Sequence, residues 1–391
     1  MGTRNRKSQG SPTTSSPAKN EKKQEVKQTL MQKMITRSIV GVTMIAFFAA
    51  ILSTEWVIVI LPVLAVLLQV LVYKEIIAVR YHAVKEKNLT LFRTLNWFFL
   101  VITLFYFYAK PTVKFLYLTH WIPQEVYQQF FHYHLWISFC LYVMGFCGFI
   151  MSLKPKMYKY QFTQLAWTAL SLLIVVFQCA SFVSNFQNGL FWVVFPACMV
   201  IINDIAAYFW GVAFGRKIIK AKLTTLSPNK TWEGFLGALL TTVLLSIPLC
   251  GWLMQSPHFI CPHFGFSIDE CIPTGVWVSS AHEIPGILVD LGLPEVVHFP
   301  EIYIHGVLLA VFASLIAPFG GFFASGMKRA YNIDDFNNIF PGHGGFYDRF
   351  DCQLIMTLCT FVHYRTFIQV SPVDVPQIMT LISLLSRAEQ Q

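Results

Sequence analysis

Nine long runs of apolar residues limit what this chain of 391 residues can fold into. The run over 57–72, for example, is apolar on every side rather than along one stripe. A helix of about 20 such residues crosses a bilayer, whereas a helix of a soluble core carries a single apolar face. The sequence therefore predicts an all-α polytopic membrane protein with about nine transmembrane helices. They are expected near residues 38–54, 56–73, 95–109, 134–153, 162–182, 189–212, 233–253, 302–326 and 352–370.

The low content of charged residues excludes further classes of protein. Charged residues make up 13% of the chain, against about 25% in soluble globular proteins. This is too little to cover the surface of a soluble enzyme, and the 55% of hydrophobic residues excludes a disordered or fibrous chain. The net charge of +9 does not indicate nucleic acid as a partner, because most of it lies in residues 1–37, where no aromatic residue accompanies it.

Basic residues give the predicted orientation. Residues 1–37 hold nine basic and two acidic residues and are expected to form a disordered basic tail in the cytosol. If the helices alternate, the loops on the same side hold 16 basic residues; these are 74–94, 154–161, 213–232 and 327–351. The loops on the opposite side hold two; these are 110–133, 183–188 and 254–301. This division predicts a multi-pass protein with a cytosolic N-terminus.

Asn203 and Asp204 stand inside the sixth apolar run. An ionised carboxylate there costs several kcal/mol unless it faces a polar cavity or a partner. Either Asp204 reaches water at the membrane boundary, or it lines a site, which is the interpretation we favour. Tyr208 follows by four residues, so a helix would place it on the same face as Asp204.

The loop after this run collects donors for phosphate. Arg216, Ser227, Lys230 and Thr231 precede the seventh run, and such side chains at the mouth of a helix suit an anion. Because Ser227 and Pro228 also begin a turn, an ordinary basic loop is an equal alternative.

The densest polar segment lies between the last two runs. Leaving Tyr aside, 16 of the 27 residues over 325–351 are charged, polar or glycine. Its carboxylates stand close in sequence to basic residues: Asp335, Asp348, Asp351, Lys328, Arg329 and Arg349. Mg²⁺ binds one or two carboxylates together with phosphate oxygens. The segment therefore predicts a Mg²⁺–phosphate site, with a structural ion-pair network as the alternative. His343 is either a catalyst or a hydrogen-bonded histidine of the turn.

This segment resembles the signature of the phosphatidate cytidylyltransferases, also called CDP-diacylglycerol synthases. The family pattern is S-x-x-K-R, then K-D after four residues, then P-G-H-G-G-x-x-D-R-x-D. The chain matches it at Ser325, Lys328, Arg329, Asp335, Pro341, Gly342, His343, Gly344, Gly345, Asp348, Arg349 and Asp351. The segments around Asp204, Arg216 and Lys230 are similar to the family's other patterns, so the specific match covers roughly residues 195–355.

The resemblance implies a reaction between CTP and phosphatidic acid, assisted by Mg²⁺, in which a site at the cytosolic face forms CDP-diacylglycerol and diphosphate. It implies catalytic roles for Asp335, Asp348, Asp351, His343, Lys328 and Arg329, of which the three aspartates would hold the metal. It implies substrate binding by Asn203, Asp204, Tyr208, Arg216, Ser227, Lys230, Thr231, Ser325, Gly344, Gly345 and Arg349. The basic tail and the long loop 254–301 are similar to the eukaryotic branch, which implies the endoplasmic reticulum membrane.

The chain then divides into the tail 1–37, N-terminal transmembrane helices in 38–190, a catalytic transmembrane region in 191–370 with a luminal loop 254–301, and a C-terminal tail 371–391. In the luminal loop, Cys261 and Cys271 are either a disulfide or two free thiols. The side of the C-terminus stays open, as does the oligomeric state, for which a homodimer is one arrangement.

Two departures from the family pattern keep alternatives open. Asp334 replaces the lysine of the K-D pair, and Asn229 replaces a second lysine after Pro228. Both remove positive charge, so a weakly active paralogue that binds lipid or acts as a scaffold is one alternative. A membrane transporter is another, although its polar residues would lie near the bilayer midplane.

Overall fold

The computed structural model describes residues 30–54, 56–80, 92–227, 230–262, 275–283, 289, 294–337, 339 and 344–369, and they form mainly helices. The first half consists of α1 (Leu30–Leu52), α2 (Val57–Ala78), α4 (Phe92–Leu118), α5 (Gln124–Met151), α6 (Tyr158–Leu172), the π-helix η1 (Leu173–Phe177) and α7 (Gln178–Gln187). The second half consists of α8 (Phe191–Phe214), α9 (Trp232–Leu253), α10 (Pro257–Ile260), the 3₁₀ turn η2 (Gly275–Trp277), β1 (Ser279–Glu283), β2 (Val296–Pro300), α12 (Ile302–Leu315), α13 (Pro318–Tyr331), α14 (Tyr347–His363) and the π-helix η3 (Tyr364–Ile368).

Long apolar helices confirm a polytopic membrane protein. Within the described part of the chain, seven helical stretches are long and apolar enough to cross a bilayer. They are Val57–Ala78, Arg93–Leu118, Gln124–Met151, Tyr158–Gln187, Phe191–Phe214, Trp232–Leu253 and Ile302–Tyr331. The first and the last predicted runs, 38–54 and 352–370, also fall on helices, but on α1 and α14, which are not among the seven.

Two differences from the prediction concern where helices begin and end. Helix α1 begins at Leu30, so residues 30–37, which were predicted as tail, are helical. The run 302–326 is split between α12 and α13 at Ile316 and Ala317. Pro318, the first residue of α13, has no N–H to donate, so it suits the start of a new helix.

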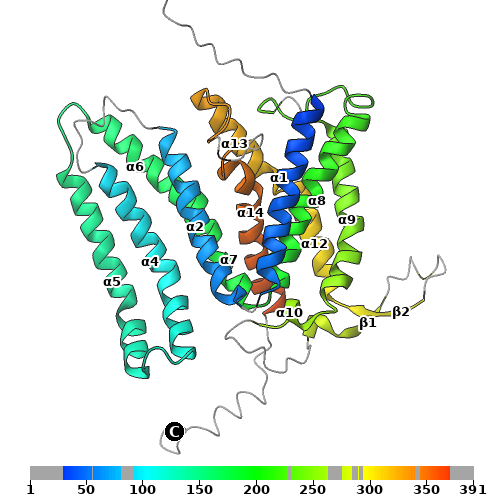
Figure 1. Cartoon of the computed structure of the whole chain (residues 1–391), viewed down its shortest axis with the longest axis horizontal. Helices are drawn as coiled ribbons and strands as arrows, with labels where there is room; N and C mark the ends of the chain where they lie inside the picture. Colours follow the sequence, from blue (N-terminus) through cyan, green and yellow to red (C-terminus); the bar gives the residue numbers. More distant parts are fainter. Residues whose placement is uncertain are drawn as a thin grey trace, which may run out of the picture.

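The structure agrees with the predicted all-α architecture and adds one short β-hairpin to it. Strands β1 and β2 pair antiparallel, with Ser279 opposite Pro300 and Glu283 opposite Val296. They belong to the predicted luminal loop and lie at one end of the helices, at the bottom of Figure 1. Cys261 is disulfide-bonded. Its predicted partner, Cys271, lies outside the described residues, as do the tail 371–391 and most of the tail 1–37.

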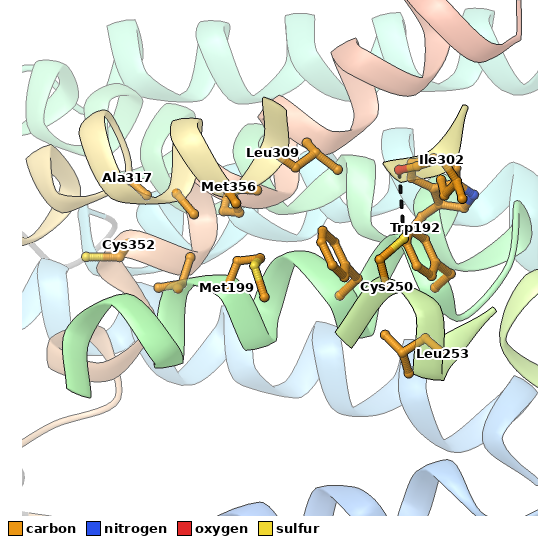
Figure 2. Packing of buried hydrophobic residues seen from close by; sticks show 14 residues of the cluster. Trp192, Met199, Cys250, Leu253, Ile302, Leu309, Ala317, Cys352 and Met356 are labelled. Atoms are coloured by element: carbon orange, nitrogen blue, oxygen red, sulfur yellow. Dashed lines mark hydrogen bonds between the residues drawn. The ribbon is translucent and has the colours of Figure 1, made fainter. Parts of the chain in front are cut away.

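The larger core cluster packs α8, α9, α12 and α14 together. Phe191 and Phe195 stack with ring centroids 4.9 Å apart. Cys250 Sγ lies 3.8 Å from the carbonyl oxygen of Ile302 (Figure 2). Gly306 leaves room for the ring of Phe195, because a Cβ there would lie 3.2 Å from that ring. Close approach at small residues is the usual way in which membrane helices pack.

A second core cluster joins the first half of the chain to the last two helices. It contains residues from α2, α4, α6, η1, α13 and α14, among them Tyr73, Trp167, Met327 and Tyr347. Trp167 Nε1 donates to the carbonyl oxygen of Ile76, which ties α6 to α2. The end of α2, the end of α13 and the start of α14 therefore lie together, at the top of Figure 1 and opposite the hairpin.

Candidate active site

An ammonium group held between two carboxylates forms the centre of the candidate site. Lys328 Nζ, in the last turn of α13, lies 2.5 Å from Asp348 Oδ1 and 3.4 Å from Asp335 Oδ1. The side chain of Asp348 is 2% exposed, that of Lys328 is 21% exposed and that of Asp335 is 44% exposed. The pair Lys328–Asp348 is therefore largely removed from solvent, whereas Asp335 lies on the solvent-exposed side of the group.

Backbone amides hold the other oxygen of Asp348. Asp348 Oδ2 accepts hydrogen bonds from the N–H of Gly345, at 2.9 Å, and from the N–H of Phe336, at 3.2 Å. Gly344 has φ of +76°, and a Cβ there would lie 2.7 Å from Asp348 Oδ2. Glycine is needed at this position both for its backbone conformation and for the space that the carboxylate occupies.

Glu75, near the end of α2, reaches the same segment. Its carboxylate is buried and accepts hydrogen bonds from the N–H of Phe346, at 3.1 Å, and from the N–H of Tyr347, at 2.9 Å. Glu75 was not predicted as a site residue, because it falls in the predicted loop 74–94. The signal for it was that apolar residues continue after it, over 76–78, so that the helix extends past this carboxylate.

A second group of charges lies between α8, α9 and α14. Asp204 interacts electrostatically with Lys230 and Arg349, and Asp351 interacts with Asp204 and Lys230. Asp351 Oδ1 also accepts from the N–H of Cys352, at 2.7 Å. The structure thus brings together four residues that the sequence analysis predicted, from segments about 150 residues apart.

Small residues let α13 and α14 approach closely at Asp351. A Cβ at Gly320 would collide with the backbone oxygen of Asp351, and a Cβ at Gly321 would lie 3.4 Å from Asp351 Oδ2. Lys230 lies beside this contact, with Nζ 4.8 Å from the centre of the Phe322 ring. Gly320 and Gly321 therefore allow the backbone and the carboxylate of Asp351 to lie close against α13.

The loop between α8 and α9 is held by two residues at the start of α9. Thr231 is the N-cap, and its Oγ1 accepts from the N–H of Gly234 at 3.1 Å. Glu233 Oε1 accepts from the N–H of Ile218, at 3.1 Å, and of Ile219, at 2.7 Å. Thr231, which was predicted to bind substrate, thus has a structural use in capping the helix.

The structure also describes the surroundings of other residues that were predicted to belong to the site. Asn203 is buried, and its Oδ1 has no hydrogen-bond partner among the described residues. Ser325 Oγ donates to the carbonyl oxygen of Gly321 in its own helix. Tyr208, Arg216 and Arg329 are exposed, and Ser227 is half-buried.

Part of the predicted site cannot be compared with the structure. His343, Pro341, Gly342 and Asn229 lie outside the described residues. Asp334, one of the two departures from the family pattern, is described and exposed. It stands beside Asp335, so it adds negative charge to the open side of the site.

The described residues contain no cluster of three or more His, Cys, Asp or Glu side chains that could hold a metal ion. Asp335 and Asp348 nevertheless converge on one cation, the Lys328 ammonium. Two carboxylates that share one positive charge are a suitable donor set for Mg²⁺, which prefers oxygen ligands.

These features define a polytopic helical membrane protein whose acidic and basic side chains gather in two groups, one where α13 meets the start of α14 and one that includes Asp204 of α8 and Asp351 of α14. Residues 35–367 match the family model described as "Cytidylyltransferase family". The chain belongs to the cytidylyltransferase family.

Individual relatives agree with the family match. The chain is 45% identical over 368 residues to a "Probable phosphatidate cytidylyltransferase" of Dictyostelium discoideum, covering 92% of this chain and 76% of that protein. It is 40% identical over 339 residues to "Phosphatidate cytidylyltransferase 1" of Rattus norvegicus, covering 85% of this chain and 72% of the relative. It is also 40% identical over 339 residues to "Phosphatidate cytidylyltransferase 2" of Bos taurus, covering 85% and 74%.

Proposed function

We propose that this protein is a phosphatidate cytidylyltransferase that converts CTP and phosphatidic acid into CDP-diacylglycerol and diphosphate. The family match and the named relatives support the reaction. The observation that carries the proposal is the group Lys328–Asp335–Asp348, because it lies where the family signature falls and gathers charge for a polyphosphate.

In the proposed reaction, a phosphate oxygen of phosphatidic acid forms a bond to the α-phosphorus of CTP. The bond from that phosphorus to the β-phosphate oxygen breaks, and diphosphate leaves with the bonding electron pair. The attacking oxygen is already anionic at neutral pH, so the step needs no strong general base. Its main barrier is the approach of two anions, which the site lowers by positioning the substrates and by placing cations around them.

Each basic side chain would neutralise phosphate charge from its own position in the site. Lys230 interacts electrostatically with Asp204 and Asp351 and would contact the substrate phosphates from the side of α9. Arg329 and Arg349 are exposed and would reach phosphates that arrive from water. Lys328 is held between its two carboxylates and would approach a phosphate oxygen over a short distance.

We assign Mg²⁺ to the carboxylates Asp335 and Asp348. Asp351, the third carboxylate that the resemblance implies, lies in the second group of charges, and the described residues hold no cluster of three such side chains. When bound, Mg²⁺ would neutralise charge on the phosphates of CTP. The convergence of Asp335 and Asp348 on Lys328 supports this assignment, since both already face one positive charge. Gly344 and Gly345 would keep the backbone close to the substrate, and His343 would donate to an oxygen.

We place the site at the cytosolic face of the endoplasmic reticulum membrane, with the N-terminus in the cytosol. The excess of basic residues in the loops on that side supports this orientation. There CTP arrives from water while the phosphate of phosphatidic acid stays at headgroup depth. A homodimer remains a prediction.

The transporter alternative is less well supported, because Glu75 lies near the end of α2, Lys328 in the last turn of α13 and Asp348 in the first turn of α14, and because the sequence has no internal duplication.

The test is an assay of the purified protein in liposomes that contain phosphatidic acid, supplied with CTP, with and without Mg²⁺. We expect Mg²⁺-dependent CDP-diacylglycerol, and loss of it in Asp348→Asn. A folded wild-type protein that forms no product would contradict the proposal. Restoring lysine at 229 and 334 would then show whether the protein is a weakened enzyme.

A further inference from the structure

We infer that Glu75 is a positioning residue of the active site, which holds the backbone before Asp348 in the geometry that the reaction needs. This inference rests on the proposed function. Glu75 lies on α2, in the half of the chain where the sequence has no catalytic motif, and the segment that it binds is more than 270 residues away. The two helices are neighbours in space (Figure 1).

Burial is the first reason to assign a role to this carboxylate. Glu75 is 4% exposed and is the only acidic residue of α2. A buried carboxylate is costly unless hydrogen bonds satisfy it, so an apolar residue would be cheaper if packing were the only requirement. Both oxygens of Glu75 are used, one for each of two neighbouring amides.

The second reason is that three consecutive backbone N–H groups donate to two different carboxylates. The N–H of Gly345 donates to Asp348, whereas the next two, of Phe346 and Tyr347, donate to Glu75. Helix α14 has no capping side chain at its own N-cap, Phe346, so Glu75 supplies that cap from another helix. The position of Glu75 thereby fixes both the backbone path into α14 and the direction in which Asp348 points.

The third reason is the glycine at 345. A Cβ at that position would lie 2.7 Å from Glu75 Oε2 and 2.8 Å from Glu75 Oε1. With a side chain at position 345 the Glu75 carboxylate would have to shift, so Gly345 lets Glu75 reach the amides. The two glycines of the segment thus accommodate two carboxylates, Glu75 at Gly345 and Asp348 at Gly344.

The experiment compares Glu75→Gln with Gln69→Leu in the full-length protein in liposomes. Gln69 is a matched control, because it is also buried on α2, and its Nε2 bonds Tyr108 rather than α14. Two quantities are measured: kcat and KM for CTP, and hydrogen exchange of the peptide 344–350 by mass spectrometry. The exchange measurement reports the contact whether or not the protein is active.

We expect Glu75→Gln to lower kcat by about tenfold or more while KM for CTP changes by less than about threefold. The peptide 344–350 should exchange about tenfold faster, because one amide loses its acceptor. Gln69→Leu should leave kcat and this exchange within about twofold of the wild type.

Three results would overturn the inference: a Glu75→Gln variant with wild-type kcat, unchanged exchange of 344–350, or equal losses of kcat in both variants. If the wild type itself forms no CDP-diacylglycerol, the proposed function fails, and the exchange result still decides whether Glu75 holds the segment.

Discussion

The ion pair between Lys328 and Asp348 makes the sharpest prediction about the site, which concerns Asp348→Asn. The change keeps the shape of the side chain and removes its charge. One oxygen remains to accept from Gly345 and Phe336, but Lys328 loses the carboxylate at 2.5 Å. The free energy of unfolding and the turnover number should both fall, for different reasons.

The magnitude follows from burial and from the second partner. Removing one partner of a buried ion pair costs about 3–5 kcal/mol. Lys328 is 21% exposed and keeps Asp335, so the lower end of this range applies. We expect Asp348→Asn to lower the free energy of unfolding by about 3 kcal/mol, which is about a hundredfold in the folding equilibrium. The turnover number of the folded variant should fall as well, because the group that faces the substrate phosphates loses the negative charge of Asp348.

The assay is a double-mutant cycle of Asp348→Asn, Lys328→Met and the double variant. Unfolding is followed by tryptophan fluorescence during titration with denaturing detergent, and activity by formation of CDP-diacylglycerol. The coupling energy should exceed about 1 kcal/mol, because each single change removes the same contact. Single effects that add to within about 0.5 kcal/mol would refute the ion pair as an energetic unit. A folded Asp348→Asn protein with wild-type turnover would refute its role in the reaction.

Three further predictions concern other parts of the site. Gly344→Ala should lower kcat by about tenfold or more, because the strained φ and the contact with Asp348 act together, whereas Gly275→Ala, at φ of +61° with nothing within 4 Å, should leave kcat unchanged. Equal effects on kcat would contradict this. Glu233→Gln should raise KM for CTP by about tenfold with little change in kcat, since the loop around Ile218 loses charge-assisted hydrogen bonds, and initial rates over a range of CTP concentrations measure it. Chelation of Mg²⁺ should stop product formation and added Mg²⁺ should restore it; turnover that persists in excess chelator would count against a metal site.

The helices could be predicted from the sequence because membrane spans are a local property. Every predicted run falls on a helix, and runs 189–212 and 233–253 agree with α8 and α9 to within a few residues. Run 95–109 was too short, since α4 continues past Pro111 to Leu118. The hairpin β1–β2 was missed because its ten residues carry no strong alternation of apolar and polar side chains.

The site could be predicted only in part, because contacts between distant segments leave no local pattern. The sequence indicated Asp204, Lys230, Arg349 and Asp351, and the structure brings them together. The sequence could not indicate that the Lys328 ammonium is paired with two carboxylates, which leaves it less available to a substrate phosphate. The role of His343 remains a prediction, since that residue lies outside the described part of the chain.

The link between Glu75 and α14 has a consequence for how the protein is made. Synthesis adds about 5–20 residues per second, so the 271 residues between Glu75 and Phe346 take about 14–54 s. During that time Glu75 has no amides to bind. Its place three residues before the end of α2 lets it wait near water at the membrane surface. The proposed active site is therefore completed only when residues up to α14 have left the ribosome, and a nascent chain that lacks α14 should be inactive however well its earlier helices have inserted.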